Sequence, residues 1–186
     1  MKAIVNADKN WGIGLGDALI NHIPADMKFF KAKTTGNVVV MGRSTFMTFP
    51  GPRALPNRVN IVLTADKNWS APDVIVCHSL EELESELKKY DTDTVYVIGG
   101  MSVYNQLVPL CDTAYVTKVD TAKPADKFFP DLDSDASWEI IEEGEEQDGV
   151  GGKEEIANLV VLRLLPTVTE LFRLHADIAA GEAGLV

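Results

Sequence analysis

Cysteine and long apolar runs are scarce in this chain, and their scarcity excludes several classes of protein. The two cysteines among 186 residues, Cys77 and Cys111, are too few for a disulfide scaffold and lack the spacing of a metal site. No apolar run approaches the roughly 18 residues of a membrane-spanning helix, and the first residues lack the apolar segment of a signal peptide. The three histidines, His22, His78 and His175, are too scattered for metal ligands. We therefore expect a reduced cytoplasmic protein that binds no metal and no membrane.

Basic residues are also in short supply. The chain has 17 Lys and Arg against 28 Asp and Glu, a formal net charge of -11, which argues against a nucleic-acid partner. Much of the excess lies in residues 139–155, where Lys153 is the only cation among many carboxylates. The rest of the chain is nearly balanced, so an anionic small molecule remains a suitable ligand where a few Arg or Lys residues gather.

Short runs rich in Val and Ile alternate with helical patterns through most of the chain. Bounded apolar runs of this kind predict buried strands at 2–7, 37–42, 58–64, 73–78 and 94–100. Between them, helices are expected at 24–34, 79–90 and 101–110, the second opening with a capping box from Ser79 to Glu82. The alternation indicates an α/β domain in which helices pack on a largely parallel central sheet.

The end of the pattern differs. Strands at 113–119, 137–143 and 156–165 follow one another without helices, and the last two predict an antiparallel hairpin. We expect one domain over residues 1–165. The extension 166–186 has the spacing of a short amphipathic helix ending near Gly181, and a helix and disordered chain both remain open for it.

The stretch "NWGIGLGDAL" at 10–19 resembles a dinucleotide fingerprint, but its context is wrong. The pattern G-x-G-x-x-G requires its third glycine at position 17, which is Asp17, and a helix directly after the strand. The next helix begins only near Pro24. The length of this interval favours a functional lid, and a plain flexible connection is the alternative.

Two other turns fit a phosphate better. "VVVMGRST" and "VYVIGGMSVY" each lead from a strand through glycine into a helix, where free N–H groups stabilise anions. Arg43 adds a planar guanidinium suited to phosphate. Each turn alone is equally compatible with an ordinary tight connection, but two of them in one parallel sheet favour a dinucleotide.

Two charged residues are candidates for substrate binding. Asp26 stands in the first turn of the expected helix beside Phe29 and Phe30. Such a residue is usually an exposed helix-capping group, and the functional alternative is a carboxylate that aids proton delivery or grips an amidine-like edge. Arg58, at the start of an apolar strand, is either a solvated strand end or the anchor of a ligand carboxylate.

Several segments together resemble the dihydrofolate reductase family in order and spacing over residues 1 to about 165: "DKNWGIG", "IPADMKFFK", "VVVMGRST", "NRVNIVLT", "VYVIGGMSVY", "AYVTKVD" and "DKFFP". The resemblance implies a three-layer α/β/α fold whose eight-stranded, mostly parallel sheet has an antiparallel strand at its C-terminal edge. It implies NADPH-dependent reduction of 7,8-dihydrofolate to tetrahydrofolate, with hydride transfer to pterin C6, by an enzyme that we expect to be monomeric.

The resemblance also assigns site residues by position. Asp26 matches the catalytic acid that grips the pterin and promotes N5 protonation, and Thr117 shares this polar end of the pocket. Arg58 matches the anchor of the glutamate α-carboxylate, and Asp126 a loop residue that hydrogen-bonds the lid. The apolar walls of the substrate pocket are Val5, Met27, Phe30, Phe49, Leu55 and Ile98.

The cofactor site implied by the resemblance is larger. Arg43, Ser44 and Thr64 match the residues at the 2′-phosphate end of NADPH, Thr45 those at the pyrophosphate, and Gly99 and Gly100 a cis Gly-Gly bond. The full set is Asn6, Ile13, Gly14, Leu19, Gly42, Arg43, Ser44, Thr45, Leu63, Thr64, Gly99, Gly100, Met101, Ser102, Val103 and Tyr104. Within it, Ile13, Gly14 and Leu19 are expected to face the nicotinamide when the lid closes.

One departure from the family pattern lies just after the lid. The family usually has Pro-Trp where this chain has Ile20 and Asn21. A non-catalytic NADPH- or folate-binding module, in which Asn21 reflects lost chemistry, is therefore one alternative. A pyrimidine reductase on the same scaffold is a second alternative. Asp26 together with Arg58 suits a pterin that carries a glutamate.

Overall fold

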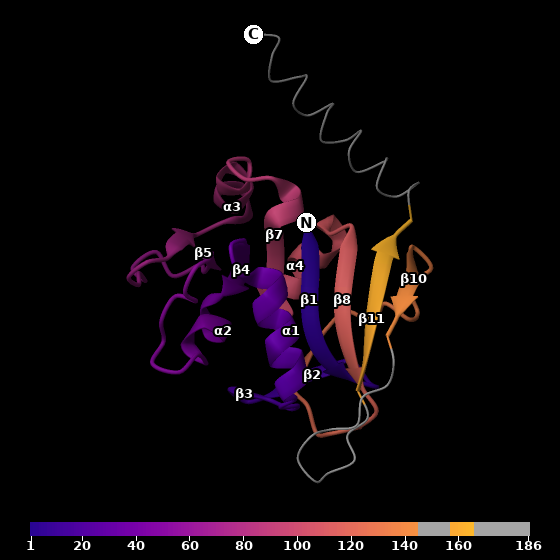
Figure 1. The fold of residues 1–186 in the computed structure, drawn as a ribbon. Helices are drawn as coiled ribbons and strands as arrows, with labels where there is room; N and C mark the ends of the chain where they lie inside the picture. The colour runs from indigo at the N-terminus through magenta and orange to yellow at the C-terminus, as the bar shows by residue number, and fades with distance from the viewer. Residues whose placement is uncertain (145–156, 166–186) are drawn as a thin grey trace.

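A computed structural model describes residues 1–144 and 157–165, and an eight-stranded sheet is its main feature (Figure 1). The strand order is β10-β11-β8-β1-β7-β4-β5-β6. The strands are β1 (Lys2–Asp8), β4 (Val38–Gly42), β5 (Val59–Leu63), β6 (Ile75–Cys77), β7 (Val95–Gly99), β8 (Thr113–Val119), β10 (Trp138–Glu143) and β11 (Ala157–Leu164). The expected extension 166–186 and most of the acidic turn between β10 and β11 lie outside the described residues.

All neighbouring pairs from β8 to β6 are parallel, whereas β11 runs antiparallel to β8 and β10 antiparallel to β11. The predicted α/β class and the C-terminal hairpin are therefore confirmed. The hairpin folds so that β11 pairs with the parallel part of the sheet and β10 is the outermost strand.

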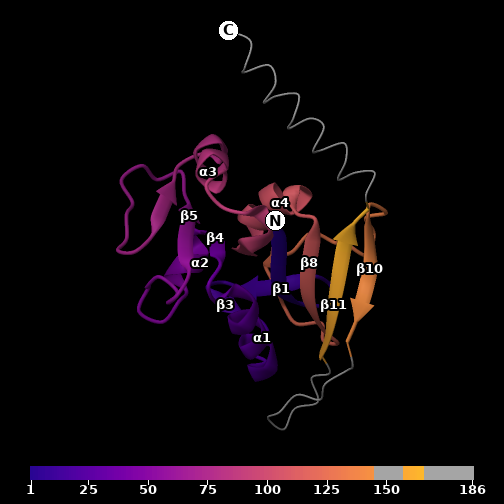
Figure 2. The same cartoon turned by 45° about the horizontal axis from the view of Figure 1, so that its top comes forward.

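The helices form a layer on each face of the sheet. They are α1 (Pro24–Thr34), α2 (Arg43–Met47), α3 (Leu80–Leu87) and α4 (Met101–Leu107). Alternate residues of β1 divide between two cores: Ala3 and Val5 pack in the cluster that contains side chains of α3 and α4, and Ile4 packs in the cluster that contains Phe46 of α2 and is bordered by Phe30 of α1. Figure 2 shows α3 and α4 on one side of the strands and α1 on the other. The three-layer expectation is confirmed.

Most of the expected elements occur within a residue or two of their predicted ends. Ser79 accepts a hydrogen bond from the Glu82 amide at 3.2 Å, as the capping pattern predicts, but the Glu82 carboxylate reaches the amide of His78. The helix predicted at 101–110 ends at Leu107 and continues as a 3-10 turn, Val108–Leu110, because Pro109 cannot donate an α-helical hydrogen bond.

Three short strands were not predicted. β2 (Gly12–Leu15), β3 (Ala18–Leu19) and β9 (Lys127–Phe128) form a separate small sheet in the order β3-β2-β9. The sequence interpretation treated the first two as part of a flexible lid, because glycine-rich strands lack a hydrophobic alternation. Their partner β9 comes from more than a hundred residues further along the chain.

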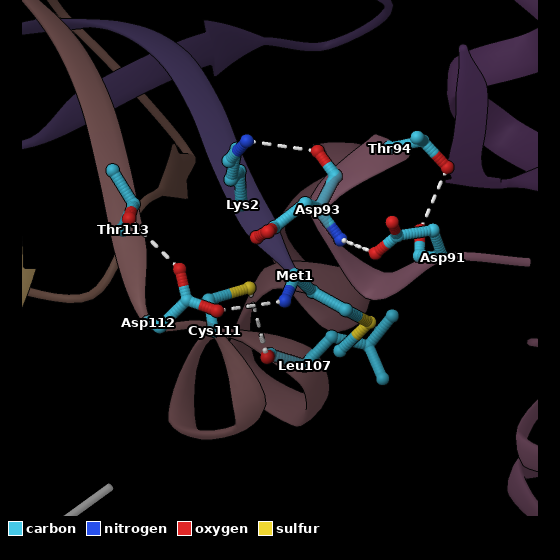
Figure 3. Close-up of polar contacts among 9 residues, drawn as sticks. All are labelled: Met1, Lys2, Asp91, Asp93, Thr94, Leu107, Cys111, Asp112 and Thr113. Atoms are coloured by element: carbon cyan, nitrogen blue, oxygen red, sulfur yellow. Dashed lines mark hydrogen bonds and ion pairs between the residues drawn. The ribbon is translucent and has the colours of Figure 1, made fainter.

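An ion pair fixes the start of the central strands (Figure 3). The ammonium group of Met1 donates to Asp112 Oδ2 at 3.0 Å, the Thr113 hydroxyl donates to Asp112 Oδ1 at 2.8 Å, and the Asp112 amide donates to the Met1 carbonyl oxygen at 3.0 Å. Partial burial raises the pKa of the Asp112 carboxyl. The hydrogen bonds from Met1 and Thr113 have a larger opposite effect, so the pKa is lowered overall. The charged contact thus holds β1 and β8 at a common starting point.

We expect Asp112→Asn to lower the free energy of unfolding at pH 7. Because the folded-state pKa is lowered, the stabilisation is present above the unfolded carboxyl pKa of about 3.9 and is lost as the pH falls through the folded value. Denaturant titrations from pH 7 to pH 2.5 should therefore show the variant approaching the wild type at acid pH. Asp120→Asn, which removes an exposed contact with Lys9, is the matched control. A difference that does not change with pH would contradict the prediction.

Candidate active site

Asp26 lies where α1 faces the ends of β1 and β8. Its Oδ1 accepts a hydrogen bond from the Thr117 hydroxyl at 2.6 Å, and its Oδ2 accepts one from Asn6 Nδ2 at 3.1 Å. Asn6 and Thr117 are register partners in the two adjacent parallel strands, so both side chains reach the same carboxylate. The sequence interpretation grouped Thr117 with Asp26, and the structure brings them together.

A further amide extends this group. Asn21 is 4% exposed, and its Nδ2 donates to Asn6 Oδ1 at 3.2 Å. The sequence marks position 21 only as a departure from the family pattern, and the resemblance places Asn6 in the cofactor set. An asparagine inside the otherwise apolar run "KAIVNA" was the signal that a polar partner lies nearby, because buried polar groups require hydrogen bonds.

The residues expected to line the substrate pocket fall into two groups. Phe30, Phe49 and Leu55 are half-buried and pack around the cluster that contains Ile98. Val5 is buried in the cluster of the opposite face, and Met27 is exposed on α1 next to Asp26. Phe30, one turn from Asp26 on α1, thus joins the helix of the carboxylate to this apolar cluster, and Met27 is exposed on the same helix.

Arg58 is held in place by neighbours rather than left in solvent. Its Nε donates to Thr34 Oγ1 at 2.8 Å and its Nη1 donates to the Pro56 carbonyl oxygen at 2.7 Å. The Thr34 hydroxyl in turn donates to the Phe30 carbonyl oxygen at 2.7 Å. The guanidinium is therefore oriented by the end of α1, the helix that carries Asp26, and has N–H groups left for an anion.

The two glycine turns lie side by side, because β4 and β7 are neighbours. A Cβ atom added to Gly42 would lie 4.0 Å from the Gly100 amide nitrogen, and one added to Gly100 would lie 2.9 Å from Thr45 Oγ1. The peptide bond between Gly99 and Gly100 is cis. Within residues 1–144 and 157–165, no side chain caps the first turn of α2 or α4. Two helix N-termini without side-chain caps thus meet at one place, an arrangement that stabilises anions.

Arg43, the first residue of α2, and Thr64, which follows β5, are linked through Asp66. Arg43 Nη1 donates to Asp66 Oδ2 at 2.7 Å, and the Asp66 amide donates to Thr64 Oγ1 at 3.3 Å. The ion pair between Asp66 and Arg43 was not predicted, because nothing in the sequence around Asp66 indicates which cation it pairs with. Ser44 of α2 is exposed nearby, and Leu63, which precedes Thr64, is half-buried.

The residues expected at the start of α4 divide by exposure. Met101 and Ser102 are exposed, whereas Val103 and Tyr104 are buried in the core. The Tyr104 hydroxyl donates to the Ile4 carbonyl oxygen at 2.7 Å. Burial raises the pKa of Tyr104, and the negative charge of Asp26 raises it further. The hydroxyl therefore stays protonated and acts as a donor. Tyr104 therefore ties α4 to β1 close to the carboxylate.

The segment expected to be a lid is the small sheet β3-β2-β9. Gly14 pairs with both Leu19 and Lys127, and Ile13 is 8% exposed. The Gly16 amide donates to both carboxylate oxygens of Asp126 at 3.1 Å, which confirms the predicted contact between Asp126 and the lid. This contact is the main cause of a lowered pKa of Asp126.

The glycines of the lid have separate structural reasons. Gly16 has φ of 58°, the left-handed conformation that other residues adopt at a cost. At Gly12 an added Cβ would lie 2.9 Å from Ala125 Cβ, so this position requires the close approach of two chain segments. Asp8, 1% exposed, accepts hydrogen bonds from the amides of Gly12 and Lys123 and joins those segments at the base of the lid. Conformational freedom alone, the basis of the sequence interpretation, does not account for Gly12.

Comparison with known proteins shows the family of this chain. The profile of the dihydrofolate reductase family matches residues 1–160. The chain is 37% identical to the type 3 dihydrofolate reductase of Salmonella typhimurium over 130 residues, which are 70% of this chain and 77% of the relative. It is 33% identical to dihydrofolate reductase of Staphylococcus aureus over 140 residues, 75% and 83% of the two chains. The chain belongs to the dihydrofolate reductase family.

A solved member of the family has the same fold. Dihydrofolate reductase from Enterococcus faecalis, in complex with NADP(H) and RAB-propyl, superposes with a TM-score of 0.76 at 37% identity, covering 88% of this chain and 95% of that one. No helix in the part of the chain that the structure describes is long and apolar enough to cross a membrane.

We expect Asp126→Ala to loosen the lid of this family member without unfolding the main sheet. The Gly16 amide loses both carboxylate acceptors, so its hydrogen exchange should accelerate by about fivefold or more as local opening becomes easier. Exchange measured by NMR at Gly16 and at a main-sheet residue such as Val40 separates local from global opening. Asp73→Asn, an exposed change away from the lid, is the control. Unchanged exchange at Gly16 would contradict the prediction.

Proposed function

We propose that this protein reduces 7,8-dihydrofolate to 5,6,7,8-tetrahydrofolate with NADPH as the reductant. The observation that carries the proposal is the Asp26 carboxylate, which accepts hydrogen bonds through both oxygens on a helix whose Phe30 packs against an apolar cluster, in a chain that belongs to the dihydrofolate reductase family. Such a carboxylate can accept two N–H donors from the amidine-like edge of a pterin.

The residues present fit NADPH. The paired turns at Gly42 and Gly100 leave a cradle in which a side chain at position 100 would collide with Thr45, and the open N–H groups of α2 and α4 favour an anion such as a pyrophosphate. Arg43 and Thr64 would bind the 2′-phosphate, with Arg43 exchanging its contact with Asp66 for the phosphate. When bound, NADPH supplies the hydride that reaches pterin C6.

Asp26 would hold the pterin edge and promote the arrival of a proton at N5. Thr117 and Asn6 orient the carboxylate from β8 and β1, and Tyr104 stays protonated beneath it. Half-buried Phe30 and Phe49 keep part of the surroundings apolar, which strengthens charge-assisted hydrogen bonds at the site.

Arg58 would bind the glutamate α-carboxylate at the far end of the substrate. Thr34 and the Pro56 carbonyl oxygen fix its guanidinium, so little conformational entropy is lost when a carboxylate binds in a bidentate manner. Ile13, Gly14 and Leu19 of the lid would cover the reacting rings and exclude bulk water, which favours hydride transfer.

The experiment that tests the proposal mixes protein, NADPH and dihydrofolate and follows the nicotinamide absorbance at neutral pH. Steady consumption of NADPH with tetrahydrofolate as the product is the expected result. Binding of both ligands without consumption would instead indicate the non-catalytic module. Consumption with a pyrimidine of the flavin pathway, but not with dihydrofolate, would indicate the second reductase.

We expect Asp26→Asn to lose most of the turnover at neutral pH, by about a hundredfold or more, the usual range for a lost proton-transfer group. An amide keeps the shape of the carboxylate but loses its charge and presents only one accepting atom instead of two. The NADPH dissociation constant, measured by fluorescence titration, should stay near the wild-type value. Asp73→Asn is the control for general effects of the substitution. Equal turnover of Asp26→Asn and wild type would remove Asp26 from its assigned role.

We expect Arg58→Ala to weaken dihydrofolate binding by about tenfold to a hundredfold, because a charge-assisted contact contributes about 1.5–3 kcal/mol. Titration calorimetry with dihydrofolate measures the effect, and a folate analogue without the glutamate should bind both proteins equally. Arg163→Ala, at an exposed position of β11, is the control. An unchanged dissociation constant for Arg58→Ala would exclude this residue from the site.

A further inference from the structure

Three side chains form a directed chain of hydrogen bonds that ends on the carboxylate of Asp26. Asn21 Nδ2 donates to Asn6 Oδ1 at 3.2 Å, and Asn6 Nδ2 donates to Asp26 Oδ2 at 3.1 Å. Thr117 occupies the other carboxylate oxygen from the opposite side. Asn21 thus influences Asp26 without touching it. We refer to Asn21, Asn6 and Asp26 as the amide ladder.

The direction of the amide ladder follows from the charge of its last member. An ionised carboxylate only accepts hydrogen bonds, so Asn6 must present its amide nitrogen to Asp26. Its carbonyl oxygen then faces Asn21, which must present its own amide nitrogen. Rotating either amide by half a turn would place two acceptors against each other. The orientation of both asparagines is therefore determined from Asp26 outward.

This direction leaves an unpaired group at the outer end. Asn21 is 4% exposed, and its Oδ1 is buried without a hydrogen-bond partner among the described residues. An unpaired buried carbonyl costs about 1–3 kcal/mol of stability, whereas an apolar side chain of similar size would carry no such penalty. Stability alone therefore does not account for an asparagine at this position.

We propose that Asn21 is a positioning residue for the reaction, acting through Asn6 to fix the orientation of the Asp26 carboxylate. The proposal rests on the proposed function, because it concerns the group assigned to bind the pterin and aid its protonation. With both oxygens held, the carboxylate plane is fixed before substrate arrives. Without Asn21, the Asn6 amide loses the hydrogen bond on its oxygen and is held only by Asp26, so the joined side chains of Asn6 and Asp26 are free to move together. Displacements of about 1 Å at a reacting centre change rates by up to about a hundredfold.

Two substitutions at position 21 distinguish positioning from packing. Asn21→Leu removes the donor to Asn6, and Asn21→Asp keeps the shape but, once ionised, can only accept, which forces the Asn6 oxygen toward Asp26. Because burial raises the pKa of a carboxyl group, Asn21→Asp is measured at pH 7 and again at pH 9, where the ionised form is favoured. We expect the single-turnover rate of NADPH oxidation to fall by about threefold in Asn21→Leu and by about tenfold or more in Asn21→Asp. The NADPH dissociation constant should stay within about twofold of the wild-type value in both. Matched changes at exposed Asn105 control for the loss of an asparagine.

A packing role predicts the opposite order, because Asp resembles Asn in shape more closely than Leu does. In Asn21→Leu an unpaired Asn6 oxygen replaces the unpaired Asn21 oxygen, so we expect a melting temperature close to that of the wild type. Equal rates for wild type and Asn21→Asp, or a larger loss in Asn21→Leu, would overturn the proposal.

A double variant tests whether Asn21 acts through Asn6. Asn6→Ala should slow the single turnover by about tenfold, and adding Asn21→Leu to it should change the rate no further, because the link to Asp26 is already broken. Effects that multiply in the double variant would show that position 21 acts independently, and the ladder would be wrong.

The wild-type reaction is measured first, so the two proposals fail in different ways. A wild type that consumes no NADPH with dihydrofolate overturns the proposed function, and the positioning role with it. An active wild type with unaffected variants overturns the positioning role alone. The ladder itself has a readout without activity: the side-chain amide NMR signal of Asn6 in the free protein should shift in Asn21→Asp and stay in place in the Asn105 variants. An unmoved signal in Asn21→Asp contradicts the ladder.

Discussion

The parallel pairing of β1 with β8 is the constraint on which the rest of the site depends. Residues Lys2 to Asp8 run beside Thr113 to Val119 in a continuous register. The Met1–Asp112 ion pair holds this register at one end, and the hydrogen bond from the Lys123 amide to Asp8 holds it at the other. Because the register is fixed, Asn6 and Thr117 stand side by side and reach the two oxygens of one carboxylate on α1. A shift of either strand by one residue would turn its side chain, Asn6 or Thr117, to the opposite face of the sheet.

The same strands also connect the two layers of helices. Tyr104 of α4 donates to the Ile4 carbonyl oxygen from one side of the sheet, while Asp26 of α1 meets Asn6 and Thr117 at the strand ends. These contacts come from helices and strands rather than from loops. The position of the Asp26 carboxylate is therefore set by the sheet, through Asn6 and Thr117. The lid sheet is joined to the rest of the chain by Asp8 and Asp126, and its Ile13 packs in the same apolar cluster as Val5 of β1.

Charge is distributed unevenly in a way that suits an anionic cofactor and substrate. The formal net charge is -11, yet the candidate anion contacts depend on two arginines, each already oriented by neighbours. Arg43 is held by an exposed carboxylate that a phosphate can displace, because exposed ion pairs contribute little. Arg58 is held by uncharged oxygens, so its whole charge stays available for a carboxylate. Backbone N–H groups at two helix ends supply further positive potential without adding any basic residue.

By itself the sequence determined the main sheet strands, the major helices, the parallel arrangement and most candidate residues. These depend on local signals: apolar runs, capping patterns and glycine turns. Tertiary structure alone decided what distant residues do to one another. Asn6 donates a hydrogen bond to Asp26, and Asp66 forms an ion pair with Arg43. Gly12 allows the close approach of two chain segments instead of providing flexibility. Such roles arise from the pairing of segments many residues apart, and a local pattern carries no information about which partner the fold will bring.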